Sequence, residues 1–180
     1  MNRADLIRVI QQEARPLVEG LYGELRTNLG TSHYHRLSNE ELFRRGQAVY
    51  QHLAEWLASR DETAIRRAGE ELGRRRFAEG IPLGQVVLAL ILEEKHLWVY
   101  GGAGPAPEES LKLEVAEFFG RTIYSTAHGF EEALADSIRR SGRTAVPAVP
   151  VERISQKPAP AQEKSDMQIS RGGDVGELGG

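Results

Sequence analysis

An all-α fold is predicted by this sequence of 180 residues: a single bundle of about five helices around a buried central helix, with a disordered C-terminal tail. First, apolar residues recur at spacings of three and four over most of residues 1–142, as on one face of a helix. Second, a run within residues 81–100 is apolar on every side, so neighbouring helices must surround it. Third, the composition changes after residue 142, which predicts a helical domain over 1–142 and a tail over 143–180.

The first predicted helix spans residues 3–27, and it is interrupted. Its apolar residues lie at spacings of four and seven along one face. Pro16 falls inside this pattern, and a proline in a helix interior removes a backbone hydrogen bond and clashes with the preceding turn. We therefore expect a kink or a break near residues 14–16, which would leave two shorter helices. Residues 28–37 have no helical period and contain turn formers, so a loop is predicted there.

A second helix is predicted to begin after Ser38. Ser38 and Glu41 have the spacing of a capping box, in which each side chain bonds the backbone N–H of the other residue. Leu37 and Leu42 are placed as a hydrophobic staple across the same boundary. The inner face is predicted to comprise Leu42, Val49, Tyr50, Leu53, Trp56 and Leu57, with Arg44, Arg45, Gln51 and Glu55 turned outward.

The third helix is predicted from a cap at Asp61 to about Glu79, with Gly80 ending it. Pro82 then suits the first position of the central helix, because the N–H that proline lacks would have no helical partner there. The central helix covers residues 81–100, and we expect it to be buried on all sides. Its apolar run is shorter than the roughly 20 residues that span a bilayer.

The final helix is predicted over residues 107–140, and about 50 Å of helix exceeds the width of a compact core of this size. It therefore either bends at Gly120 or Gly129, or its end projects beyond the bundle. Exposed apolar stripes usually mark a partner surface. Because closed dimers dominate homo-oligomers, a homodimer is expected. The predicted interface residues are Phe130, Leu134 and Ile138.

The composition excludes several classes of function. A formal net charge of −3 offers no electrostatic reason to expect a nucleic acid or a membrane as partner. The absence of cysteine excludes disulfides and thiolate zinc sites, which fits a reducing compartment. The N-terminal residues have no uninterrupted apolar segment of the kind found in signal peptides. A cytoplasmic location is therefore expected.

Few residues suggest chemistry. Glu93 and His96 have the Glu-x-x-His spacing of carboxylate-bridged di-iron bundles, but such a site needs a second pair, and His128 with Glu131 runs in the reverse order. No phosphate-binding loop or nucleophile motif is present. No catalytic residue, metal ligand or cofactor is therefore predicted, and a metal- or ligand-binding bundle of the di-iron type is the alternative.

Two other groups of side chains have competing interpretations. A small-ligand pocket at the end of the central helix would be lined by Trp56, His96, Trp98 and Tyr100, although aromatic residues of this kind more often fill a core. The three arginines at 74–76 follow two glutamates by four residues, which is typical of a solvent-exposed last turn rather than a phosphate contact.

Residues 72–98 resemble the helical N-terminal domain of RsbRD-type co-antagonists of the kinase RsbT, which also precedes some bacterial histidine kinases. The pattern Arg-Phe-x-Glu-Gly-x-Pro-Leu over residues 76–83 and the later Leu-Trp pair carry most of this resemblance. It implies a non-catalytic bacterial signalling input or protein-interaction module, with a role in stress response. The family normally places an output domain behind this one, whereas here the tail follows. A stand-alone sensor or adaptor with a signalling protein as partner is therefore expected.

Overall fold

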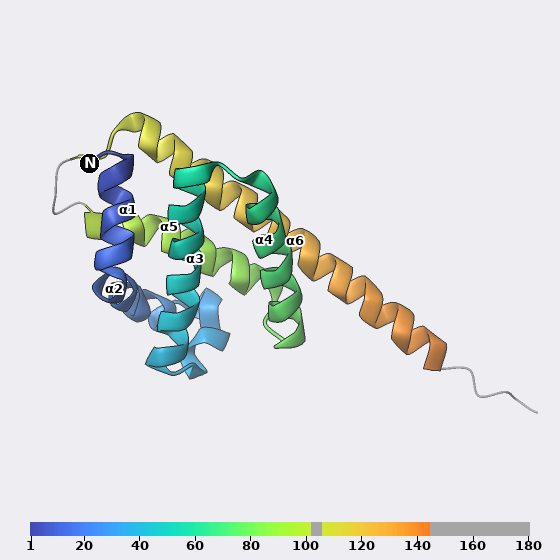
Figure 1. Ribbon diagram of the computed structural model, residues 1–180. Helices are drawn as coiled ribbons and strands as arrows, with labels where there is room; N and C mark the ends of the chain where they lie inside the picture. The colour runs from blue at the N-terminus through green and yellow to red at the C-terminus, as the bar shows by residue number, and fades with distance from the viewer. Residues whose placement is uncertain (102–105, 145–180) are drawn as a thin grey trace, which may run out of the picture. The chain divides into compact units, whose positions relative to one another are not determined.

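The computed structural model describes residues 1–101 and 106–144, which form six α-helices and one 3₁₀-helix of a single compact unit. The all-α prediction is confirmed. The helix count exceeds five because the first predicted helix is divided and a short helix follows it. The elements are α1 (Arg3–Gln12), α2 (Ala14–Thr27), η1 (Leu29–Arg36), α3 (Asn39–Ser59), α4 (Glu62–Ala78), α5 (Leu83–Gly101) and α6 (Glu109–Thr144), arranged as in Figure 1.

The predicted break near Pro16 is confirmed. Glu13 separates α1 from α2, and Pro16 lies in the first turn of α2, where no backbone N–H is needed. The N-terminus of α1 carries a complete capping box that sequence reasoning missed. Asn2 Oδ1 accepts a hydrogen bond from the backbone N–H of Asp5 at 3.0 Å, and the Asp5 carboxylate accepts one from the backbone of Asn2 at 3.1 Å.

Residues 28–37 were predicted to be a loop, and this prediction is wrong. Most of the segment forms the 3₁₀-helix η1, in which Thr31 alone departs from helical backbone angles. Side chains hold it in place: the Thr31 hydroxyl is fully buried and donates to the carbonyl oxygen of Leu25 at 2.7 Å, and Tyr34 is buried as well. A 3₁₀-helix has no 3.6-residue apolar period, which explains why the sequence pattern did not reveal it.

The predicted helix boundaries around α3 and α4 are largely correct. Ser38 Oγ accepts the N–H of Glu41 at 3.1 Å, but the Glu41 carboxylate binds Arg44 and Arg45 instead of completing the capping box. Asp61 caps α4 by accepting from two backbone N–H groups. Gly80 follows with a left-handed φ of 71°, a conformation that favours glycine and ends the helix.

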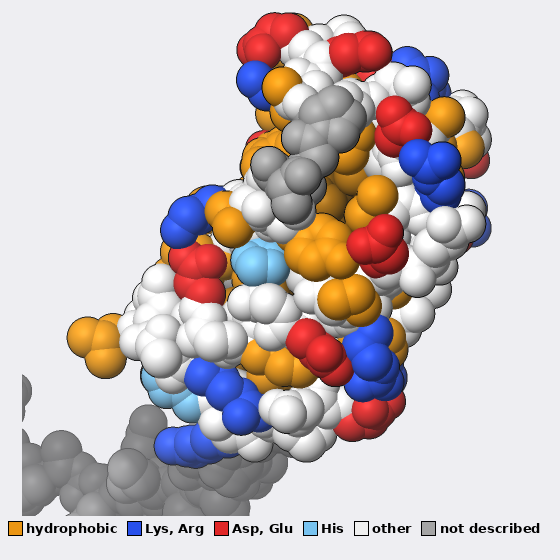
Figure 2. All heavy atoms as spheres, turned by 90° about the vertical axis from the view of Figure 1, so that its left-hand side faces the viewer, with side chains coloured by type: hydrophobic (Ala, Val, Ile, Leu, Met, Phe, Trp, Pro, Cys, Tyr) orange, Lys and Arg blue, Asp and Glu red, His pale blue; other side chains and the backbone are white. Residues whose placement is uncertain are grey.

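The central helix α5 is less buried than predicted. It packs against α2, η1, α4 and α6, and Leu90 and Leu97 are buried in the main core. Ile91 and Val99, however, are exposed, since none of these neighbours covers that side within the described residues. Figure 2 shows hydrophobic side chains exposed on the face formed by α1, α2 and the end of α5. Pro82 lies immediately before the helix rather than at its first position.

Helices α4 and α6 lie side by side with their backbones in close contact (Figure 1). A Cβ atom at Gly73 of α4 would overlap the carbonyl oxygen of Thr126 and lie 2.7 Å from the amide nitrogen of Phe130. A Cβ at Gly129 of α6 would overlap the backbone of Glu70 in the same way. Only glycine permits this approach.

The final helix does not break at either of its glycines. α6 is one continuous helix of 36 residues, and Gly129 serves close packing rather than a bend. Its C-terminal turns extend past the other helices (Figure 1). Of the two alternatives for this helix, a bend or a projecting end, the second is therefore the one observed. The helix continues four residues beyond the predicted end, to Thr144. The remainder of the predicted tail, residues 145–180, lies outside the described part of the chain.

Candidate functional site

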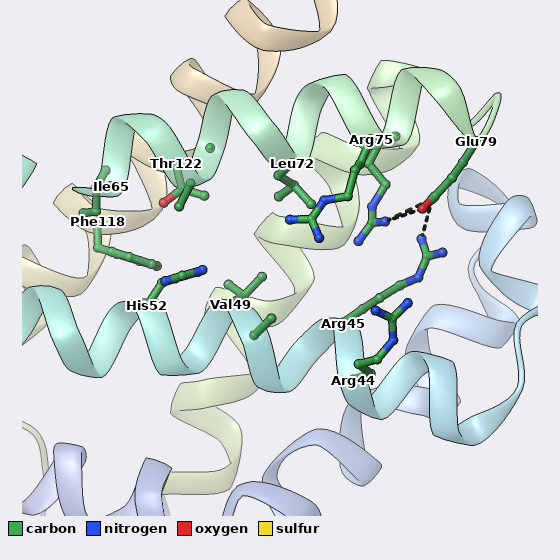
Figure 3. Close-up of a pocket in the computed structure, with 14 residues that line it drawn as sticks. Arg44, Arg45, Val49, His52, Ile65, Leu72, Arg75, Glu79, Phe118 and Thr122 are labelled. Carbon is green, nitrogen blue, oxygen red and sulfur yellow. Dashed lines mark hydrogen bonds and ion pairs between the residues drawn. The ribbon is translucent and has the colours of Figure 1, made fainter. Parts of the chain in front are cut away.

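A pocket of about 100 Å³ lies between α3, α4 and α6. Ile65 and Leu72 of α4 and Phe118 of α6 supply apolar lining. Figure 3 shows Arg44, Arg45 and Arg75 toward one end, where Arg45 is joined to Glu79, whereas Ile65 and Phe118 lie at the other end beside His52 and Thr122. The pocket therefore combines a cationic entrance with an interior in which apolar side chains lie beside His52 and Thr122.

Five charged side chains form a chain of ion pairs along this entrance. Glu41 contacts Arg44 at 2.7 Å and Arg45 at 2.6 Å. Arg45 also contacts Glu79 at 2.9 Å, and Glu79 accepts from Arg76 at 3.0 Å (Figure 3). Burial alone would raise the pKa of Glu41, but the hydrogen bonds from Arg44 and Arg45 lower it below its ordinary value. This series of ion pairs begins with Arg44 and ends with Arg76, so three cations share two carboxylates.

Two of these arginines correct the sequence interpretation. Arg45 was predicted to turn outward and Arg76 to belong to a solvent-exposed last turn, yet their side chains are only 11% and 10% exposed. Arg74 and Arg75 are exposed as predicted, and Arg75 pairs with Glu71 at 3.7 Å. Their positions in the helical pattern did not indicate that Arg45 of α3 and Arg76 of α4 lie near the same carboxylate, that of Glu79.

Glu93 is a buried acid behind this charged cluster. It lies on α5, and its Oε2 atom has no hydrogen-bond partner, while its backbone carbonyl accepts from the hydroxyl of Tyr50 at 2.9 Å. Burial raises the pKa of Glu93 to about 8, in spite of the opposing charge of Arg76. Glu93 therefore holds its proton at neutral pH and acts as a neutral core residue.

We expect the stability of the protein to fall with increasing pH because of Glu93. Between its unfolded pKa near 4.5 and its folded pKa near 8, the folded state keeps a proton that the unfolded state has lost. This single group should lower the free energy of unfolding by about 5 kcal/mol over that window. Glu93→Gln should remove this dependence and melt at a higher temperature than the wild type at pH 8.

Thermal melts from pH 5 to pH 8 provide the measurement. Glu131→Gln, which removes an exposed carboxylate, is the control and should keep the wild-type slope. If wild type and Glu93→Gln lose stability equally over this range, Glu93 is already ionised in the folded state.

The residues predicted for an aromatic pocket lie on two helices. Trp56 of α3 is buried against Phe118, with ring centroids 6.0 Å apart, while Trp98 and Tyr100 of α5 pack on the edge of the same core cluster. The Tyr100 hydroxyl donates to Glu13 at 2.7 Å. His96 contacts Gly20 of α2, and its buried Nε2 atom has no hydrogen-bond partner. The pocket between α3, α4 and α6 contains none of these four residues, and the aromatic pocket stays a prediction.

The metal alternative gains no support from the geometry. Among residues 1–101 and 106–144, no three His, Asp or Glu side chains come together in an arrangement that could hold a metal ion. Within the same residues, no helix combines the length and apolar character required to cross a membrane.

The predicted interface residues on α6 differ in their surroundings. Phe130 is half-buried and makes an edge-to-face contact with Phe77 of α4, with ring centroids 5.3 Å apart. Leu134 and Ile138 are 43% and 63% exposed. The exposed part of the stripe therefore begins one turn after Phe130.

Searches against protein-family models, curated proteins and solved structures found no match to this chain.

Proposed function

We propose that this chain is a non-catalytic bacterial signalling input module, a stand-alone sensor or adaptor that forms a homodimer through α6. One observation carries the proposal: the same helix lines the pocket and continues to the exposed stripe. Phe118 and Thr122 of α6 line the pocket, and Leu134 lies on the same unbroken helix. A helix rises 1.5 Å per residue, so about 18 Å separate Thr122 from Leu134. A shift of α6 at the pocket would therefore move the stripe as well.

The resemblance to RsbRD-type domains supports the same role. It favours a cytoplasmic protein of the stress-response type whose downstream partner is another signalling protein.

A second copy of the chain is the proposed occupant of the stripe formed by Leu134 and Ile138. Acidic residues at 131 and 132 precede the stripe, and basic residues at 139 and 140 follow it. In an antiparallel two-fold pair centred near residue 136, the acidic end of each helix would face the basic end of the other. This arrangement is self-complementary, as a closed dimer interface must be.

The dimer is tested by measuring the molar mass of the protein by light scattering as it elutes from a size-exclusion column. The wild type should have twice the 20.0 kDa chain mass, and Leu134→Glu should be a folded monomer, because two new carboxylates would meet in an apolar interface. Leu113→Glu is the matched control, since Leu113 is an exposed leucine on the first turns of the same helix, and it should remain a dimer. A monomeric wild type, or equal dissociation of both variants, would rule out pairing through this stripe.

A further inference from the structure

We propose that the pocket between α3, α4 and α6 binds a small amphipathic anion, a carboxylate with a short apolar tail. The carboxylate would lie between Arg44 and Arg75, and the tail would extend toward Leu72 and Phe118. The inference deepens the proposed function and rests on it, because it names the ligand class for a pocket lined by the same helix. The ligand proposal is tested by binding, whereas the dimer proposal is tested by molar mass, so the failure of one can be distinguished from the failure of the other.

The charge balance at the pocket entrance favours an anion. Arg44, Arg45 and Arg76 share the two carboxylates of Glu41 and Glu79, so the nearly buried Arg45 and Arg76 are both paired and one positive charge is in excess at the exposed Arg44 end. An excess of positive charge beside a concave site attracts anions to it. The negative charge of a ligand bound here would neutralise the excess positive charge of this series of ion pairs.

The neighbouring acids do not supply that charge. Glu93, behind the cluster, is neutral at neutral pH because burial raises its pKa to about 8. The ion pair of Arg75 with Glu71 is 3.7 Å long, which exceeds a hydrogen bond, so the Arg75 guanidinium retains donors for a ligand. Arginine presents these donors in a planar fork that matches a carboxylate.

The apolar end of the pocket limits the rest of the ligand. Leu72 and Phe118 contribute hydrophobic surface there, beside the polar side chains of His52 and Thr122, so this mainly apolar lining favours an uncharged tail. The volume of about 100 Å³ is below the roughly 300–1,000 Å³ of sites for drug-sized ligands. The tail therefore has only a few carbon atoms.

Titration with sodium hexanoate, followed by amide chemical shifts of the full chain, tests the proposal. Hexanoate should bind with a dissociation constant of about 1 mM or lower, and shifts should concentrate on α3, α4 and α6. Hexanamide has the same size without the charge and should bind at least about tenfold more weakly. No saturable binding of hexanoate, or equal binding of hexanamide, would overturn the proposal.

Three variants assign the site. Arg75→Gln should weaken hexanoate binding at least about tenfold. Arg67→Gln removes the same charge from the same helix away from the pocket, and it should bind like the wild type. Ala68→Leu adds three carbon atoms to the pocket wall and should abolish binding while the protein stays folded. If Arg75→Gln and Arg67→Gln bind hexanoate equally, the anion is not held at this entrance.

Discussion

Leu90→Asp is expected to abolish folding. Leu90 is 2% exposed, lies on α5 and belongs to the core cluster to which α1, α2, α3 and α6 also contribute. An unpaired carboxylate at such a position costs several kcal/mol, against a total stability of about 5–15 kcal/mol. Far-UV circular dichroism and thermal melting of the purified variant provide the measurement.

The adjacent residue supplies the control. Ile91 is 46% exposed, so the carboxylate of Ile91→Asp can remain hydrated and the variant should keep a cooperative melt. If Leu90→Asp melted like the wild type, α5 would not lie at the centre of the bundle. If both variants unfolded, the exposed side of α5 would be covered by contacts beyond those described.

Gly73→Ala is expected to have the second largest effect. The added Cβ would overlap the carbonyl oxygen of Thr126, and a backbone atom cannot move aside as a flexible side chain can. α4 and α6 would have to separate along their contact, at a cost of about 3 kcal/mol or more and a fall of about 10 °C in Tm. Gly129→Ala should cost a similar amount, because its Cβ meets the backbone of Glu70.

Gly120→Ala is the matched control for both variants. Gly120 lies within α6, and no heavy atom outside its own turn lies within 4 Å of an added Cβ. Alanine favours the helix over glycine, so this variant should gain about 0.5–1 kcal/mol. A Gly73→Ala variant as stable as Gly120→Ala would show that the two helices do not approach as closely as described.

Much of the secondary structure could be predicted because the signals are local. Ser38, Asp61 and Gly80 are capping residues, and each acts on backbone groups no more than five residues away. Pro16 marked the division between α1 and α2 for the same reason. The helix at residues 29–36 was not predicted because a 3₁₀-helix lacks the 3.6-residue apolar period of an α-helix. Its buried residue Thr31 is also polar, so it adds nothing to an apolar pattern.

The crossing of α4 and α6 left a signal that could have been used. Gly69 and Gly73 are four residues apart on one face of α4, and Ser125 and Gly129 repeat the spacing on α6. Small residues at this spacing let two helices approach closely. The spacing on one helix does not by itself show which other helix it faces, so the partner of each pair is decided by the tertiary structure.

From the sequence alone, the all-α class and most of the helix boundaries and apolar faces could be predicted, since these depend on residues within one or two turns of each other. The sequence did not reveal the pocket, because Arg45 and Arg76 are separated by 31 positions and look like surface residues on their own helices. Arg76 and Glu79 are neighbours at the end of α4, but only the packing of α3 against α4 brought Arg45 to the same carboxylate and removed both arginines from water. Burial of a charge is a property of what surrounds it, and that is decided by tertiary structure.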